Sequence, residues 1–227
     1  MYWIIIIAFA IIGAIVSGNF KRKFAKYSQM PASSGLAGKE VAAKMLRDNG
    51  IFDVKIVEGG GMGTDFYNPA EKTLSLSSDV YNGRNISATA VAAHESGHAI
   101  QHAQAYSWLT LRTAMVPVVN FANSLSPFLF FGFLIGGFVM ASLLPKLLML
   151  YIIILGITTV FALITLPVEI DASHRALAWL NRTNMATPGE EHAAATDALR
   201  SAAYTYVIAA LGSLTLLLYM LGAFRND

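Results

Sequence analysis

Four long stretches without a charged residue constrain the fold of this chain more than any other feature. They cover residues 1–20, 113–145, 147–168 and 201–224. A helix of about 20 residues crosses a hydrocarbon core of about 30 Å, so each stretch is long enough to span a bilayer. Of the whole chain, 55% is apolar and 13% is charged, roughly half the charged share of a soluble domain. We therefore exclude a purely water-soluble fold.

The second stretch is longer than one upright span needs, since its 33 residues would form about 50 Å of helix. Pro127 lies inside it, and proline removes a helical hydrogen bond. We therefore expect a helix at the membrane surface over residues 107–125 and a span over about 127–144. The other spans, which bring the expected number of transmembrane helices to four, are 1–20, about 147–167 and about 202–223.

The basic residues beside the spans predict the orientation of the protein. Eight fall on one side of the membrane and two on the other, and a basic excess marks the cytoplasmic side. We expect the protein to lie in the inner cell membrane, with both chain ends on its outer side. Residues 21–112 and 169–200 would then lie in the cytoplasm. The first stretch has no small-residue cleavage site, so we expect it to remain as an anchor. The eight are Lys21, Arg22, Lys23, Lys26, Arg112, Arg175, Arg182 and Arg200, and the two are Lys146 and Arg225.

The expected fold class is a mainly α membrane protein with a small cytoplasmic α+β, zincin-like catalytic portion. Residues 33–49 show the apolar spacing of an amphipathic helix, and the segments around Val54 and Leu74 alternate as strands do. Residues 73–80 are a candidate exposed strand edge for an extended peptide, with ordinary sheet structure as the alternative. In chain order, the expected parts are an anchor (1–20), the catalytic portion (21–112), a surface helix and two spans (113–168), a cytoplasmic segment (169–200) and the last span (201–227).

Composition limits the chemistry that the chain can support. It contains no cysteine, which excludes disulfides, thiolate zinc sites, iron–sulfur clusters and a cysteine nucleophile. Any bound metal must therefore be held by histidine or carboxylate side chains. The net charge is only +2, so no overall positive field would recruit nucleic acid.

The segment His94-Glu95-Ser96-Gly97-His98 is the strongest chemical signal. Residues four apart lie on one face of a helix, so the two imidazoles can converge on one metal ion. Glu95, next to the first histidine, could then reach a metal-bound water. The alternative is a buried helix whose histidines have ordinary hydrogen-bond partners. His102 lies about 12 Å along the helix axis from His94, which is too far for a shared metal, so we expect it to be a supporting or structural residue.

The third ligand must come from another segment, and Glu169 is the best candidate on physical grounds. It follows an apolar span directly, where an ionisable group is costly and is functional by default. Asp171 and Arg175 are four residues apart. Either they form only a helical ion pair, or Asp171 also supports a metal ligand. Thr187 and Glu190 have the spacing of a capping box, which explains Glu190 without a metal. The remaining candidates are His174, Glu191 and His192. His174 lies near Glu169 in the sequence, whereas we expect Glu191 and His192 to be solvated.

At these residues the chain resembles the bacterial membrane neutral zinc metallopeptidases of the YugP type, gluzincin-like enzymes with an HExxH motif. The resemblance covers nearly the whole chain and includes SGLAGKEVAAKML, AVAAHESGHAIQHAQAY, LRTAMVPVVN and LPVEIDASHRAL. It implies His94, His98 and Glu169 as zinc ligands and Glu95 as the catalytic base. The chain departs from the family at Phe66 and Asn68. The related prenyl-protein and heat-shock proteases carry an Asp where this chain has Ser173.

The expected function is that of a membrane-bound zinc endopeptidase with one zinc ion per chain. Glu95 would act as general base, and His174 is slightly favoured over Arg175 and His102 as the donor to the oxyanion. The expected partners are the lipid bilayer and a protein or peptide substrate, membrane-associated ones included, with a homo-oligomer left open and no nucleic acid. The rival hypothesis is a non-hydrolytic, zinc-containing membrane scaffold or chaperone-like adaptor.

Overall fold

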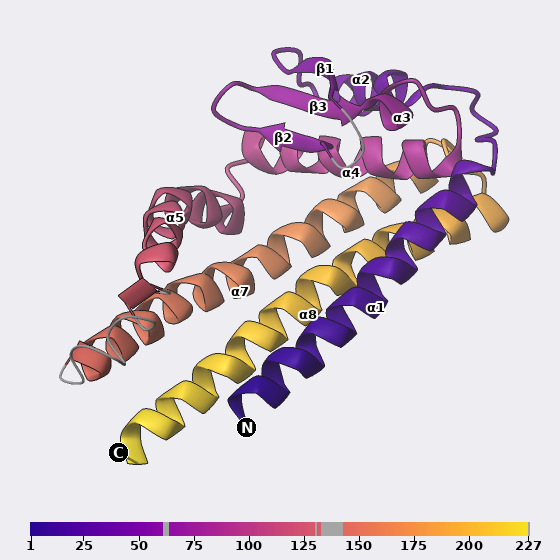
Figure 1. Cartoon of the computed structure of the whole chain (residues 1–227). Helices are drawn as coiled ribbons and strands as arrows, with labels where there is room; N and C mark the ends of the chain where they lie inside the picture. Colours follow the sequence, from indigo (N-terminus) through magenta and orange to yellow (C-terminus); the bar gives the residue numbers. More distant parts are fainter. Residues whose placement is uncertain (61–63, 130, 133–142, 227) are drawn as a thin grey trace.

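Three long helices run side by side and carry a small α+β unit at one end (Figure 1). They are α1 (Tyr2–Ser28), α7 (Leu144–Arg182) and α8 (Glu190–Asn226). The computed structural model describes residues 1–60, 64–129, 131–132 and 143–226. Helix α8 packs against both α1 and α7, and the two chain ends lie close together at the end away from the α+β unit. The expected mainly α architecture is confirmed.

The α+β unit is a three-stranded sheet with helices on it. The sheet order is β1-β3-β2, with β3 parallel to β1 and antiparallel to β2. Met45, Leu74 and Ile86 are among its fully buried core residues. Helix α4 lies between the sheet and the long helices (Figure 1). The elements are α2 (Gly38–Asp48), β1 (Lys55–Gly59), β2 (Phe66–Asn68), β3 (Thr73–Ser77), α3 (Ser78–Tyr81) and α4 (Ile86–Ala103).

Strand β3 is the central strand of this sheet, so the prediction of an exposed edge at residues 73–80 is wrong. Strands β1 and β2 pair with it on its two sides. The polar residues Ser75 and Ser77 are buried along with Leu74 and Leu76. The other edge of β2 has no strand partner among the described residues. It escaped prediction because a three-residue strand is too short to show alternation.

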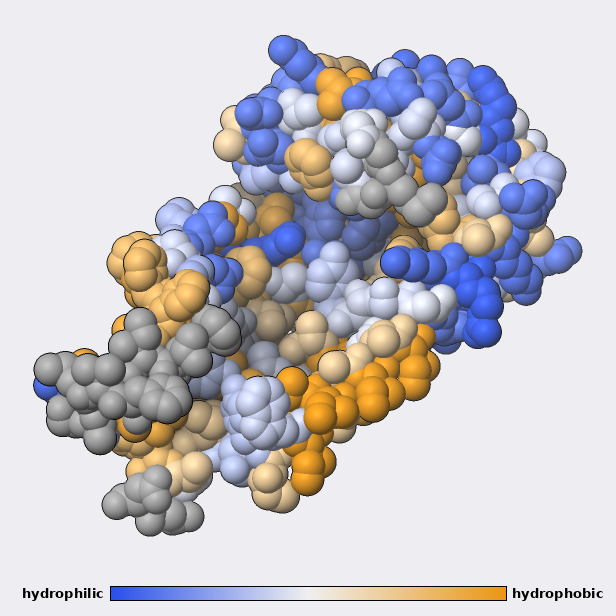
Figure 2. Space-filling model, in the orientation of Figure 1, coloured by the Kyte–Doolittle hydropathy of each residue, from blue (hydrophilic) through white to orange (hydrophobic). Residues whose placement is uncertain are grey.

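Three helices of the described part of the chain are long and apolar enough to cross a membrane, namely α1, α7 and α8 up to Arg225. The expected second span, over about 127–144, falls mostly on residues 130 and 133–142, outside the described residues. The surface helix expected at 107–125 corresponds to α5 (Ser107–Ser124), which ends in a turn just before Pro127. The face shown in Figure 2 is hydrophobic along much of the long helices and hydrophilic over the α+β unit.

Helix α7 is much longer than the span expected within it. It continues through Pro167 to Arg182 without a break, so Glu169 belongs to the same helix as the apolar span. Proline is tolerated in a long membrane helix where neighbouring helices and local adjustments compensate for the lost backbone hydrogen bond.

The start of α8 also differs from the sequence prediction. The backbone N–H of Thr187 donates to the carboxylate of Glu191 at 2.8 Å, so Glu191, and not Glu190, closes this turn. The Glu191 carboxylate also accepts the backbone N–H and the hydroxyl of Ser33. The expectation of a merely solvated Glu191 was therefore wrong, since long-range partners cannot be read from local spacing.

Candidate metal centre

The two motif histidines lie where α4 crosses α7 at close range. Gly97 makes this approach possible, because a Cβ atom there would lie only 2.7 Å from the carbonyl oxygen of Ala172. On α7, Val168 and Ala172 are completely buried. The small residues at the crossing thus bring the side chains of α4 within reach of Glu169.

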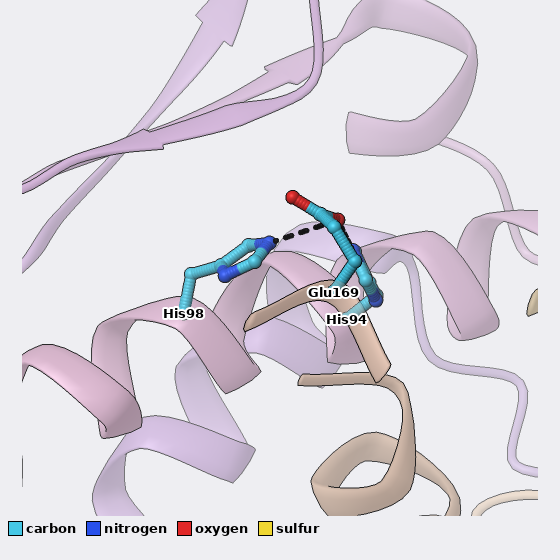
Figure 3. Close-up of side chains that lie close together, drawn as sticks. All are labelled: His94, His98 and Glu169. Atoms are coloured by element: carbon cyan, nitrogen blue, oxygen red, sulfur yellow. Dashed lines mark hydrogen bonds and ion pairs between the residues drawn. The ribbon is translucent and has the colours of Figure 1, made fainter. Parts of the chain in front are cut away.

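His94, His98 and Glu169 converge on one point (Figure 3). Oε2 of Glu169 lies 3.3 Å from Nε2 of His94 and 3.6 Å from Nε2 of His98. Tetrahedral ligands with zinc bonds of about 2.1 Å lie roughly 3.4 Å apart, so these two separations match the edges of a zinc coordination shell. One ligand atom from each of the three residues lies within 4.8 Å of the others. The donor set and its spacing fit Zn²⁺.

Burial and charge around the three residues favour a bound cation. The exposed fractions of their side chains are 13% for His94, 9% for His98 and 3% for Glu169. Burial by itself would lower the pKa of His98, but the adjacent Glu169 carboxylate outweighs burial and raises that pKa. A carboxylate this deeply buried needs positive partners, which Arg112, protonated histidines or a metal can supply.

Glu95 is buried one residue after His94. Burial raises the pKa of its carboxyl group, and the two histidines act in the opposite direction. A buried carboxylate with a raised pKa is a stronger proton acceptor than the same group in water.

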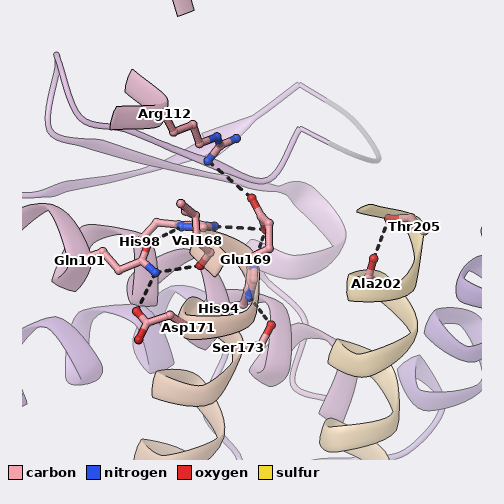
Figure 4. Close-up of polar contacts among 10 residues, drawn as sticks. All are labelled: His94, His98, Gln101, Arg112, Val168, Glu169, Asp171, Ser173, Ala202 and Thr205. Carbon is pink, nitrogen blue, oxygen red and sulfur yellow. Dashed lines mark hydrogen bonds and ion pairs between the residues drawn. The ribbon is translucent and has the colours of Figure 1, made fainter. Parts of the chain in front are cut away.

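In both histidines the ring nitrogen that faces away from Glu169, Nδ1, has a polar side-chain partner (Figure 4). Nδ1 of His94 lies 3.1 Å from Oγ of Ser173, and Nδ1 of His98 lies 3.0 Å from Oε1 of Gln101. Gln101 donates to Asp171, which also pairs with Arg175. The helical ion pair expected for Asp171 is therefore present, and Asp171 also reaches His98 through Gln101. Gln101 was not predicted, because a neutral amide inside a helix carries no distinguishing sequence signal.

Arg112 of α5 reaches the group from its other side. Its guanidinium nitrogen lies 3.5 Å from Oε1 of Glu169, the carboxylate oxygen farther from the histidines (Figure 4). The sequence indicated Arg112 only as one of the basic residues that flank the spans. Nothing in its position distinguished Arg112 from the other flanking basic residues, because its partner Glu169 lies on a distant segment of the chain.

The remaining candidate histidines lie elsewhere. His102 is exposed, and its Nδ1 hydrogen-bonds the hydroxyl group of Tyr67 at 2.8 Å. His174 is also exposed. Five residues after Glu169, it is turned about 140° around α7 from the carboxylate. The structure therefore does not bring His174 to the group.

The fold and this site define a membrane protein whose buried His-His-Glu group suits zinc. Sequence comparison agrees: the profile of the family described as "Putative neutral zinc metallopeptidase" matches residues 2–225, and the chain belongs to this family. It is 42% identical over 224 residues to the protein named "Putative membrane protease YugP" of Bacillus subtilis (strain 168). That match covers 98% of this chain and 96% of the relative. No solved structure matches the chain.

Proposed function

We propose that the protein is a membrane-bound zinc endopeptidase that hydrolyses peptide bonds. The observation that carries the proposal is the convergence of His94, His98 and Glu169 with Glu95 directly beside the first ligand. These three residues would hold one zinc ion per chain. When bound, zinc polarises the scissile carbonyl group and lowers the pKa of a water molecule.

Glu95 is the proposed general base. Its carboxylate would accept a proton from the attacking water and then donate it to the nitrogen of the leaving amine. The step is balanced: the water oxygen forms a bond to the carbonyl carbon, the carbon–nitrogen bond breaks, and the proton taken from water ends on the amine. The raised pKa of Glu95 supports both steps, since the group must bind and then release the same proton.

Arg112 replaces His174 as the proposed donor to the negatively charged oxygen that forms at the substrate carbonyl. Its guanidinium already lies beside the site, 3.5 Å from Glu169, whereas His174 faces away. A fixed positive charge beside a developing oxyanion lowers the free energy of the transition state.

The outer edge of β2 is the proposed binding site for an extended peptide. Strand β2 lies against α4, and its second edge has no strand partner within the described residues. A peptide could add to this edge by main-chain hydrogen bonds. Figure 2 shows a hollow between the α+β unit and the long helices through which a substrate could approach.

We place the active site on the cytoplasmic side of the inner membrane. The basic cluster from Lys21 to Lys26 lies in the last part of α1, the end that carries the α+β unit. Arg225 lies at the opposite end of the molecule, in the last turn of α8. The basic excess on the side of the α+β unit supports this orientation.

Glu95→Gln tests whether the protein is an enzyme or a scaffold. The amide keeps the shape of the side chain but cannot accept the proton, so hydrolysis of an unfolded substrate such as casein should fall by about 100-fold or more. Zinc content should not change. A chelator should abolish wild-type cleavage, and added zinc should restore it. Equal cleavage by the two proteins would contradict the proposed base, and zinc binding without cleavage in either protein would favour the scaffold.

A further inference from the structure

A chain of hydrogen bonds leads away from the buried face of His98. Nδ1 of His98 lies 3.0 Å from Oε1 of Gln101. Nε2 of Gln101 then donates to the backbone oxygen of Val168 and to Oδ2 of Asp171, each at 2.8 Å. Gln101 is completely buried, so its amide has no water with which to exchange these partners (Figure 4).

The two acceptors fix the orientation of the Gln101 amide. The backbone oxygen of Val168 and the carboxylate of Asp171 can only accept hydrogen bonds, so both must face the NH₂ group. The amide oxygen is then the atom that faces His98, and Nδ1 of His98 must carry a proton in order to donate to it. In neutral histidine this leaves the lone pair on Nε2, the nitrogen that points toward Glu169.

We propose that Gln101 is a positioning residue that prepares His98 to bind zinc. It fixes the tautomer and the ring orientation of His98. Its bond to Val168, the neighbour of Glu169, ties the histidine helix to the backbone that carries the third ligand. The inference rests on the proposed zinc site and specifies how that site is held before the metal arrives.

The chain of bonds ends on a charged pair, which holds the amide in place. Arg175 donates to the same oxygen of Asp171 that accepts from Gln101 and, at 2.6 Å, to the side-chain oxygen of Gln104. His94 has no equivalent support, because its partner Ser173 is a hydroxyl group that can donate or accept. The effect of Gln101 is therefore specific to His98.

Gln101→Met is the main test, because methionine has similar length and volume but no amide. The dissociation constant for zinc, measured on the purified full chain by competition with a chelator, should rise about tenfold or more, as for other lost partners of metal-bound histidines. Thr89→Val is the matched control. Thr89 is buried in the same helix, and its hydroxyl has no hydrogen-bond partner among the described residues, so this variant should bind zinc as the wild type does.

A tautomer measurement separates positioning from packing. The ring nitrogens of His98, observed by NMR in the metal-free full chain at a pH where the imidazole is neutral, should carry the proton on Nδ1 in the wild type and show a mixture of the two tautomers in Gln101→Met. A pure packing role for Gln101 would leave the tautomer unchanged.

Asp171→Ala is a milder second variant, because the Asp171 side chain is 29% exposed and its loss leaves no cavity in the core. Zinc binding should weaken about threefold or more. Wild-type affinity in Gln101→Met, with an unchanged unfolding temperature of the metal-free protein, would overturn the role of Gln101 and leave the zinc site standing. Absence of zinc from the wild type would overturn the proposed site and this inference together.

Discussion

At the scale of single residues, Gly97 controls how closely α4 approaches α7 beside Glu169, the proposed third zinc ligand. It lies between Glu95 and His98 and lets α4 approach the carbonyl oxygen of Ala172. The glycine is needed for this close contact of two helices and not for an unusual backbone angle, since it lies within a regular helix. A methyl group at this position would separate the histidines from Glu169.

Gly97→Ala should therefore destabilise the protein and weaken zinc binding at the same time. The added Cβ would meet backbone at 2.7 Å, and such overpacking costs about 1–3 kcal/mol. Thermal unfolding of the metal-free protein and zinc titration would measure the two effects. Gly156→Ala, in α7, is the matched control, because nothing lies within 4 Å of a Cβ there. Equal behaviour of the two variants would contradict the proposed tight crossing.

The proposed zinc ligands can be tested one at a time. His94→Ala, His98→Ala and Glu169→Ala should each reduce the zinc content of the purified protein from about one ion per chain to nearly none. His102→Ala should retain zinc, because His102 is exposed and bonded to Tyr67. Elemental analysis after dialysis measures the content. Metal loss in His102→Ala together with retention in Glu169→Ala would refute this set of ligands.

At the scale of secondary structure, sequence predicts what depends on local spacing. His94 and His98 could be paired because four residues complete about one helical turn, and Glu169 was found because a charge at the end of an apolar span is costly. The continuation of α7 to Arg182 and the central position of β3 were missed. Both depend on contacts with distant segments, which local periodicity does not record.

A hydrogen bond between Trp179 and Asp48 joins the end of α7 to α2, and its contribution to stability should depend on pH. Nε1 of Trp179 donates to Asp48 at 2.9 Å. Burial would raise the pKa of Asp48, but the hydrogen bonds from Lys44 and Trp179 lower it overall. A lowered pKa means that the bond stabilises the fold above the unfolded-state value of about 3.9 and is lost as the pH falls through the lower folded-state value.

Trp179→Phe should accordingly cost about 0.5–1 kcal/mol at pH 7, a small figure because Asp48 is partly exposed. The difference in unfolding free energy from the wild type should shrink as the pH falls below the folded-state pKa of Asp48. Denaturant unfolding at a series of pH values measures it. Trp108→Phe, at an exposed position of α5, should show no such trend. A pH-independent difference would mean that ring packing alone is responsible.

At the scale of the whole molecule, the asymmetry between the two ends of the helical bundle determines which compartment the site faces. The α+β unit and the basic part of α1 lie at one end, and both chain ends lie at the other. The metal centre is therefore on the same side as the basic excess.

Introduced cysteines can test this orientation without background, because the chain has no cysteine of its own. Phe52→Cys, at a residue 80% exposed in the α+β unit, should be protected from a membrane-impermeant thiol reagent in intact cells. Phe224→Cys, near the end of α8, should react. Both should react once the membrane is permeabilised. The reverse pattern in intact cells would place the active site outside.

The unbroken course of α7 joins Glu169, a proposed zinc ligand, directly to the apolar part of the helix. Glu169 and the apolar span belong to one continuous helix. A shift of α7 along its axis by one residue relative to α4 would therefore displace the carboxylate by about 1.5 Å from the histidines. Helices respond to a thicker or thinner bilayer by tilting or shifting. We therefore expect bilayer thickness to affect the position of the Glu169 carboxylate wherever it shifts α7 relative to α4.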